Sequence, residues 1–214
     1  LQLEYYKDQI NSKYNESHAR MYQNSRGVLL QGKLGNAFEF QTQFLESQSV
    51  LPYYQDTIAQ ILGVIPGMGR HKPFNKVGYD YGVSQSWLSY SPKSWWALEV
   101  GYGKQMIGNG YRSLLLSDVA MNYPMLRLHI LQPRWQYHTT AAILQEQIRL
   151  PLGDTGESLF RRKNGLWNYF TFLPTPKLEI GIMEACIDTR WTSQGTVAPP
   201  VHSYVPIIGL RGWL

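Results

Sequence analysis

The stretch that decides the fold is Tyr79-Asp-Tyr-Gly-Val-Ser-Gln-Ser-Trp-Leu-Ser-Tyr-Ser-Pro-Lys-Ser-Trp-Trp-Ala-Leu-Glu-Val-Gly-Tyr-Gly-Lys104. Its side chains alternate in character with a period of two, which is the pattern of β-strands. Ser91-Pro-Lys-Ser94 divides the stretch and predicts a hairpin turn. In that register Trp87 lies opposite Leu98, and Ser86 lies opposite Glu99. A slip of one residue would mix the apolar and polar faces.

The same alternation continues on both sides of this hairpin. It covers 36–46, 125–131 and 134–144, and two further turns follow from it. A turn at Gln132-Pro133 pairs Ile130 with Trp135, and a four-residue loop there keeps the same faces. A turn at 174–176 pairs Phe172 with Leu178. The chain is therefore expected to be an all-β meander of antiparallel strands.

The connections between the expected strands alternate in length. The short connections are Leu34–Asn36, Ser91–Ser94, Gln132–Pro133 and Pro174–Pro176. The long connections are Ser47–Val77, Gln105–Tyr123, Gln145–Gly165 and Asp188–Val205. Short periplasmic turns and long outer loops are typical of outer-membrane β-barrels. The first long loop also predicts a short helix that is capped by Asp56 and ended by Gly63.

The composition limits the class of protein. The chain has 214 residues, of which 14% are aromatic and only 16% are charged, with a mean hydropathy of −0.31. No run reaches the ~18–20 apolar residues of a spanning helix, so a bundle of membrane helices is excluded. An antiparallel transmembrane β-barrel has such a composition, and so does a soluble, secreted carbohydrate-binding or glycoside-hydrolase β domain.

Charge and cysteine content indicate the kind of partner. The net charge of +5 favours an anionic partner, such as an acidic polysaccharide or the phosphates of lipopolysaccharide. The basic residues are scattered and no recognition motif is present, so no nucleic-acid partner is expected. Cys186 is the single cysteine, which leaves no internal disulfide.

We divide the chain into a polar leading segment, 1–26, and a barrel portion, 27–214, of about eight to nine strands. Because it lacks an initiator Met and ends in an apolar, β-like stretch, we expect part of a larger barrel.

Several short motifs carry a family resemblance. In chain order they are Asn24-Ser-Arg-Gly27, Phe44-Leu-Glu-Ser-Gln48, Ile65-Pro-Gly-Met-Gly69, Asp80-Tyr81, Gly108-Asn-Gly-Tyr-Arg-Ser-Leu-Leu-Leu-Ser-Asp118 and Leu178-Glu-Ile-Gly-Ile-Met-Glu184. Over roughly residues 24–184 the chain resembles the Wzi-type capsule-assembly outer-membrane proteins, which include barrels linked to gliding motility. The resemblance implies a non-enzymatic β-barrel in the outer membrane of a Gram-negative cell, where it holds capsular polysaccharide at the cell surface among lipids and lipopolysaccharide.

Two sets of residues are candidates for binding. The polysaccharide-binding candidates lie in and beside the central motif: Lys104, Asn109, Tyr111, Arg112 and Asp118. The candidates for a polar track in the lumen are Glu39, Asp80, Glu99, Arg127, His129, Arg134 and His138. Each set has a structural alternative. Arg112 and Asp118 could form a salt bridge that anchors their loop, and the lumen residues could pair across a filled interior.

Catalytic and metal chemistry find little support in the sequence. Glu39 and Glu99 could be imagined as a glycosidase pair, but nothing fixes their separation. The five histidines lack metal-ligand spacing, and no cofactor motif is present. Tryptophans near strand ends predict an interfacial aromatic girdle or, alternatively, a platform for stacking sugars. We therefore expect a non-catalytic barrel that binds surface polysaccharide. The rival is a barrel that serves gliding motility or surface secretion through protein partners.

Overall fold

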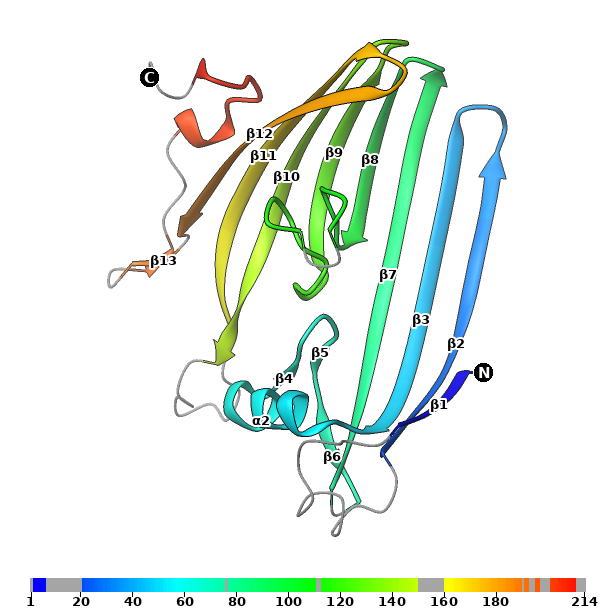
Figure 1. Ribbon diagram of the computed structural model, residues 1–214, viewed down its shortest axis with the longest axis vertical. Coiled ribbons are helices and arrows are strands. Elements are labelled where there is room, and N and C mark those ends of the chain that lie inside the picture. Colours follow the sequence, from blue (N-terminus) through cyan, green and yellow to red (C-terminus); the bar gives the residue numbers. More distant parts are fainter. Residues whose placement is uncertain are drawn as a thin grey trace.

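The computed structural model is dominated by one large, curved antiparallel sheet (Figure 1). The structure describes residues 2–6, 21–75, 77–110, 113–149, 160–189, 191–192, 195–196 and 201–210. Nine strands follow one path in the order β1-β2-β3-β7-β8-β9-β10-β11-β12, and β6 adds to β7. Their bounds are β1 Gln2–Tyr6, β2 Met21–Leu34, β3 Phe38–Val50, β6 Lys72–Phe74, β7 Gly78–Lys93, β8 Trp96–Gly103, β9 Tyr123–Leu131, β10 Trp135–Arg149, β11 Phe160–Thr175 and β12 Leu178–Thr189.

The predicted alternation of short and long connections is confirmed. Tight turns join β2 to β3, β7 to β8, β9 to β10 and β11 to β12, and all of them lie at the upper end in Figure 1. The longer connections lie toward the other end. Within the described residues, β1 and β12 are the outermost strands and do not pair with each other. The prediction of a large antiparallel sheet of about nine strands is thus confirmed in a mostly-β structure with one short α-helix, and the described strands form an open sheet rather than a closed barrel.

The predicted register of the central hairpin is wrong. Trp87 pairs with Gly101 and Leu88 with Val100, so Trp87 lies on the opposite face from Leu98. The cause is an irregularity between Tyr90 and Lys93, after which the strands turn later than predicted, between Lys93 and Trp96. A β-bulge of this kind inserts a residue into one strand and changes which side chains face each other.

The other two hairpins keep their predicted faces with a shift of two residues. Ile130 pairs with Tyr137 instead of Trp135, because the turn takes the longer of the two loops that preserve the pattern. Phe172 pairs with Ile180 instead of Leu178. A shift of two leaves every side chain on its own side, since the strand period is two.

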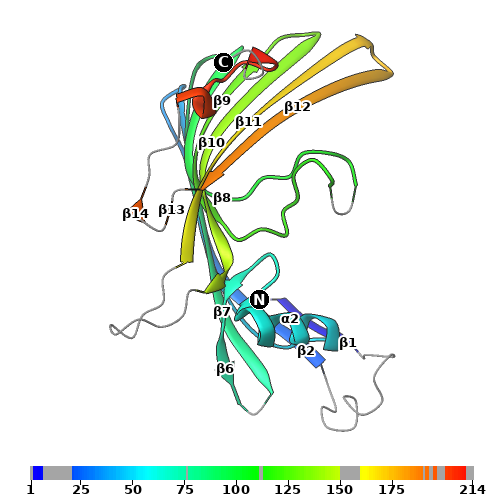
Figure 2. The same cartoon turned by 90° about the vertical axis from the view of Figure 1, so that its left-hand side faces the viewer.

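The two faces of the sheet differ in what covers them (Figure 2). The concave face carries helix α2 (Tyr53–Leu62) and the connection from β8 to β9. The convex face is largely open, apart from the segment with the short helix η1 (Val201–Tyr204), which contacts it at Tyr137 and Asn168. The remaining short strands are β4 Val64–Ile65, β5 Gly69–Arg70, β13 Trp191–Thr192 and β14 Gly195–Thr196. No helix in the described ranges has the length and apolar character needed to span a membrane.

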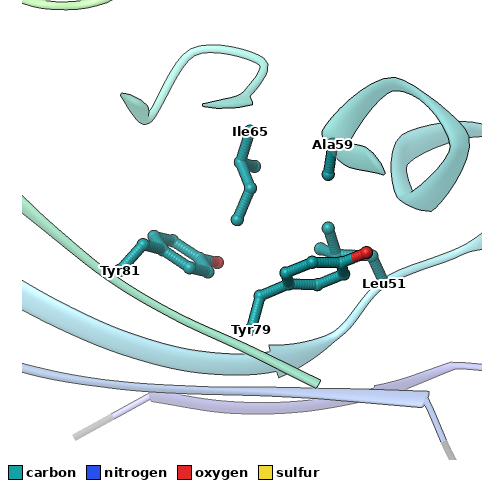
Figure 3. Packing of buried hydrophobic residues seen from close by; sticks show 5 residues of the cluster. All are labelled: Leu51, Ala59, Ile65, Tyr79 and Tyr81. Atoms are coloured by element: carbon teal, nitrogen blue, oxygen red, sulfur yellow. The ribbon is translucent and has the colours of Figure 1, made fainter. Parts of the chain in front are cut away.

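Helix α2 packs on the concave face through a small apolar core (Figure 3). Leu51, Ala59 and Ile65 pack against the rings of Tyr79 and Tyr81. Gly63 ends the helix as predicted, in the left-handed conformation at φ 69°, and its N–H donates to the Ala59 carbonyl.

The predicted cap at the helix start is wrong. The N-cap is Pro52, before the predicted Asp56, and Asp56 lies within the first turn of the helix. There the Asp56 carboxylate accepts hydrogen bonds from Gln60 and from the Tyr79 hydroxyl. Asp56 therefore fixes the helix to the sheet rather than capping it.

Candidate functional site: a polar concave face under two docked loops

The loop of residues 104–122, whose described part omits 111–112, folds back onto the concave face of the sheet. Ile107 and Leu116 pair as a β-bridge, and both pack against a cluster that includes Tyr123, Met125 and Trp167. Burying these apolar groups against the sheet gives the loop a defined position. Leu114 in this loop is fully exposed.

Gln105 fixes the start of this loop to three strands. Its backbone N–H donates to the Tyr123 hydroxyl at 3.1 Å, and its side-chain carbonyl accepts from Trp167 Nε1 at 2.9 Å. Its amide nitrogen lies 3.4 Å from the Thr140 hydroxyl. Trp167 and Thr140 are both buried, so Gln105 satisfies polar groups that would otherwise lack partners.

A second contact joins the loop to the turn between β4 and β5. The Lys104 ammonium donates to the Gly67 carbonyl at 2.6 Å, and the Gly67 N–H donates to the Val119 carbonyl at 2.7 Å. Burial lowers the pKa of Lys104, and the negative charge of Asp118 opposes part of that shift. Two segments that are 37 residues apart in the sequence thus meet through Gly67 and Lys104.

The two docked loops lie where the sheet has a gap. β8 has only 8 residues beside the 16 of β7, so β7 continues beyond the last residue that β8 pairs, Ser86. The side-chain amide of Asn122 donates to the Ser84 carbonyl at 2.6 Å. A side chain from the loop therefore replaces a missing strand at this edge.

Charged residues form one cross-strand row on the concave face. Lys33 pairs with Glu39, and across β7 the row continues through Glu99 to Arg127. The exposed pair Lys33–Glu39 is close, at 2.5 Å. The pair Arg127–Glu99 is loose, at 3.5 Å, although both side chains are mostly buried. Arg127 Nε has no hydrogen-bond partner.

Two histidines lie directly beside this row. His129 and His138 are register partners whose Nδ1 atoms are 2.6 Å apart, so one ring donates and the other accepts. The rings meet edge to face, with centroids 4.7 Å apart. The His138 ring also stacks on Tyr169 at 6.4 Å. The result is a compact group of nitrogen donors and one aromatic face.

The structure brings most of the predicted lumen residues together and separates two of them. Glu39, Glu99, Arg127, His129 and His138 share the concave face.

Two predicted residues lie elsewhere. Asp80 has the opposite parity on β7 and shares the face of Phe44 and Leu88; it lines a hollow of about 630 Å³ with Arg70 and Lys72. Arg134 lies in the turn between β9 and β10 and is exposed. The alternation places Asp80 and Tyr79 on opposite faces of the sheet, and the structure agrees. Because Tyr79 faces the concave side, Asp80 faces the convex side.

The polysaccharide-binding candidates are spread over the docked loop. Lys104 is bound to Gly67, Asp118 lies beside that contact, and Asn109 is exposed. Tyr111 and Arg112 lie outside the described residues, so the proposed salt bridge between Arg112 and Asp118 stays a prediction.

Sequence reasoning missed the residues that hold this site together. Gly67 belongs to a quoted motif, and its glycine is required because φ is +76° there. Gln105 lies inside the stretch between the two strands and carried no separate signal. Thr140, Trp167 and Tyr169 are single members of alternating strands. Only the folded structure shows that Thr140 and Trp167 contact Gln105 and that Tyr169 stacks on His138.

No group of three or more His, Cys, Asp or Glu side chains is placed to hold a metal ion within the described part of the chain. Comparison of the chain with protein-family models, with curated proteins and with solved structures gives no match. The resemblance to Wzi-type proteins therefore stays a prediction.

Proposed function

We propose that this chain forms part of the wall of an outer-membrane β-barrel in a Gram-negative cell. The convex face would contact lipid and the concave face would line the lumen. The barrel would hold capsular or other surface polysaccharide without catalysing a reaction. The distribution of polarity across the sheet supports the membrane wall. The resemblance to Wzi-type capsule-assembly proteins supports the role in holding polysaccharide.

The observation that carries the proposal is the inversion of polarity across the sheet. Leu88, Val100 and Leu126 are cross-strand neighbours on the convex face and are 42%, 53% and 49% exposed. On the concave face the charged pair Glu99 and Arg127 is only 16% and 18% exposed. Soluble proteins rarely leave large contiguous apolar patches in water, and such patches mark membranes or protein interfaces.

The aromatic residues of the convex face support the same orientation. Phe38, Tyr90 and Trp96 lie side by side near the tight turns, with ring centroids 4.6 Å and 5.9 Å apart. Trp135 and Phe170 continue the group on the neighbouring strands. Aromatic residues at this level are typical of the membrane–water interface. Trp87 is not part of this group, because it faces the concave side.

Strand lengths are also compatible with a membrane wall. β2, β3, β7, β10 and β11 each have at least 13 residues. A tilted strand needs about 9–11 residues to cross the hydrocarbon core. The extra residues would lie beyond the lipid, where α2 and the docked loops cover the concave face.

Two experiments test the proposal in its two parts. The wall is tested by cell fractionation and by gel mobility with and without boiling; we expect recovery with the outer membrane and a heat-dependent shift. A protein that stays in the soluble fraction and shows no shift would favour the secreted β domain.

The binding role is tested by deleting the gene and measuring polysaccharide that is bound to cells and free in the medium. We expect the total to stay normal and to move into the medium, with recovery on complementation. An unchanged capsule would contradict the polysaccharide role and favour a barrel with protein partners in motility or secretion.

A further inference from the structure

Arg127 on the concave face is incompletely paired. A guanidinium has five N–H donors. Here Nη1 faces Glu99 at 3.5 Å, Nη2 faces only the thioether sulfur of Met125 at 3.4 Å, and Nε has no partner. The two Nη groups of this mostly buried guanidinium keep unused N–H donors, which can bind another anion.

The neighbours of Arg127 suit a sugar that carries the anion. The His129–His138 pair lies in the next cross-strand row on the same face. The imidazole nitrogens can donate to, or accept from, hydroxyl groups. The Tyr169 ring stacks on His138 and extends this group to β11. Among the described residues, Glu99 is the one carboxylate within ion-pair distance of Arg127, and at 3.5 Å it neutralises the guanidinium incompletely.

We propose that Arg127, His129, His138 and Tyr169 form a subsite for a carboxylate-bearing sugar on the concave face. Arg127 binds the carboxylate through its planar fork, and the histidines bind neighbouring hydroxyl groups. This inference rests on the proposed function and makes it narrower: the polysaccharide held by this barrel contains uronic acid residues.

The row itself supplies matched controls. Lys33 lies on the same face and in the same cross-strand row, but its pair with Glu39 is close and exposed. Lys33→Gln therefore removes one positive charge from the same surface without touching the subsite. In the same way, Glu39→Gln is the control for Glu99→Gln.

The test measures binding of a galacturonate trisaccharide, and of the same trisaccharide with its carboxyl groups reduced, to the protein purified in detergent. We expect wild type to prefer the acidic sugar. Arg127→Gln should weaken its binding by about tenfold or more, since a charge-assisted hydrogen bond is lost. Arg127→Lys should bind between the two, because a lysine keeps the charge but lacks the fork. Lys33→Gln should match wild type.

Glu99→Gln should change the affinity for the acidic sugar in the opposite direction. Removing this carboxylate frees Arg127 and removes its repulsion of the incoming anion, so binding should become several-fold tighter. Glu39→Gln should have no effect. This gain does not depend on whether Arg127→Gln folds.

The subsite is overturned if both sugars bind equally, if neither binds, or if Lys33→Gln weakens binding as much as Arg127→Gln does. It is also overturned if Glu99→Gln fails to tighten binding. These outcomes leave the membrane-wall proposal in place, because that proposal is tested separately by fractionation and heat-dependent mobility. Conversely, a soluble protein that still prefers the acidic sugar through Arg127 would contradict the barrel and support the subsite.

Discussion

Replacing Val100 with arginine separates a lipid-facing sheet from a water-facing one. Val100 lies in the interior of β8, between Leu88 and Leu126, and is 53% exposed. If the convex face contacts lipid, an arginine near the midplane should lower the free energy of unfolding by about 2–4 kcal/mol. If that face contacts water, the same change should stay within about 0.5 kcal/mol.

The assay is reversible unfolding by denaturant of protein that has been folded into liposomes. Tryptophan fluorescence and gel mobility without boiling would report the folded fraction. Ile61→Arg is the control, because Ile61 is exposed on α2, away from the convex face. The same loss of stability in both variants, or no loss in either, would refute the assignment of the convex face to lipid.

Three further predictions concern the docked loop. Lys104→Met should lower the free energy of unfolding by about 1–3 kcal/mol, because the bond to the Gly67 carbonyl is lost. Burial lowers the pKa of Lys104 below its ordinary 10.5, so the unfolded chain holds more protons as the pH approaches that value. The deficit of Lys104→Met relative to wild type, measured in parallel denaturant titrations, should therefore widen with rising pH, and a deficit that narrows would contradict this. Gly67→Ala should lose about 1–2 kcal/mol from its positive φ and should also loosen the loop. Gly35→Ala, with a similar φ and open space, should show the loss of stability without faster proteolysis of the loop. Gln105→Leu should cost about 1–3 kcal/mol by leaving the buried Trp167 N–H unpaired, and an unchanged midpoint of thermal unfolding would show that the anchor is dispensable.

The meander could be predicted from the sequence because alternation and turn spacing are local signals. Both outer hairpins kept their faces since a two-residue shift preserves parity. The central hairpin failed for a physical reason. Trp87-Leu88-Ser89-Tyr90 places bulky side chains in both parities, so the pattern alone does not decide which face is apolar. The irregularity after Tyr90 then sets the register.

The candidate site could be predicted in part. Glu39, Glu99, Arg127, His129 and His138 were grouped correctly because each follows the alternation of its own strand.

The docking of the loop could not be predicted, since it depends on long-range contacts. Gln105 meets Trp167, and Lys104 meets Gly67, only after the sheet has placed distant segments side by side. Asp80 does not share the face of the other five candidates, and the sequence does not show that α2 covers the face of Tyr79 and Tyr81.

The most direct test of the membrane wall is the accessibility of single cysteines along β8 in protein that is folded into liposomes. Cys186 is replaced by alanine, and one cysteine is introduced in turn at each position from Ala97 to Tyr102. Each is labelled with a fluorophore and exposed to a quencher attached to lipid chains or to one dissolved in water. The account predicts quenching by lipid at 98, 100 and 102 and by the aqueous quencher at 97, 99 and 101. Equal quenching at all six positions, or the reverse alternation, would contradict it.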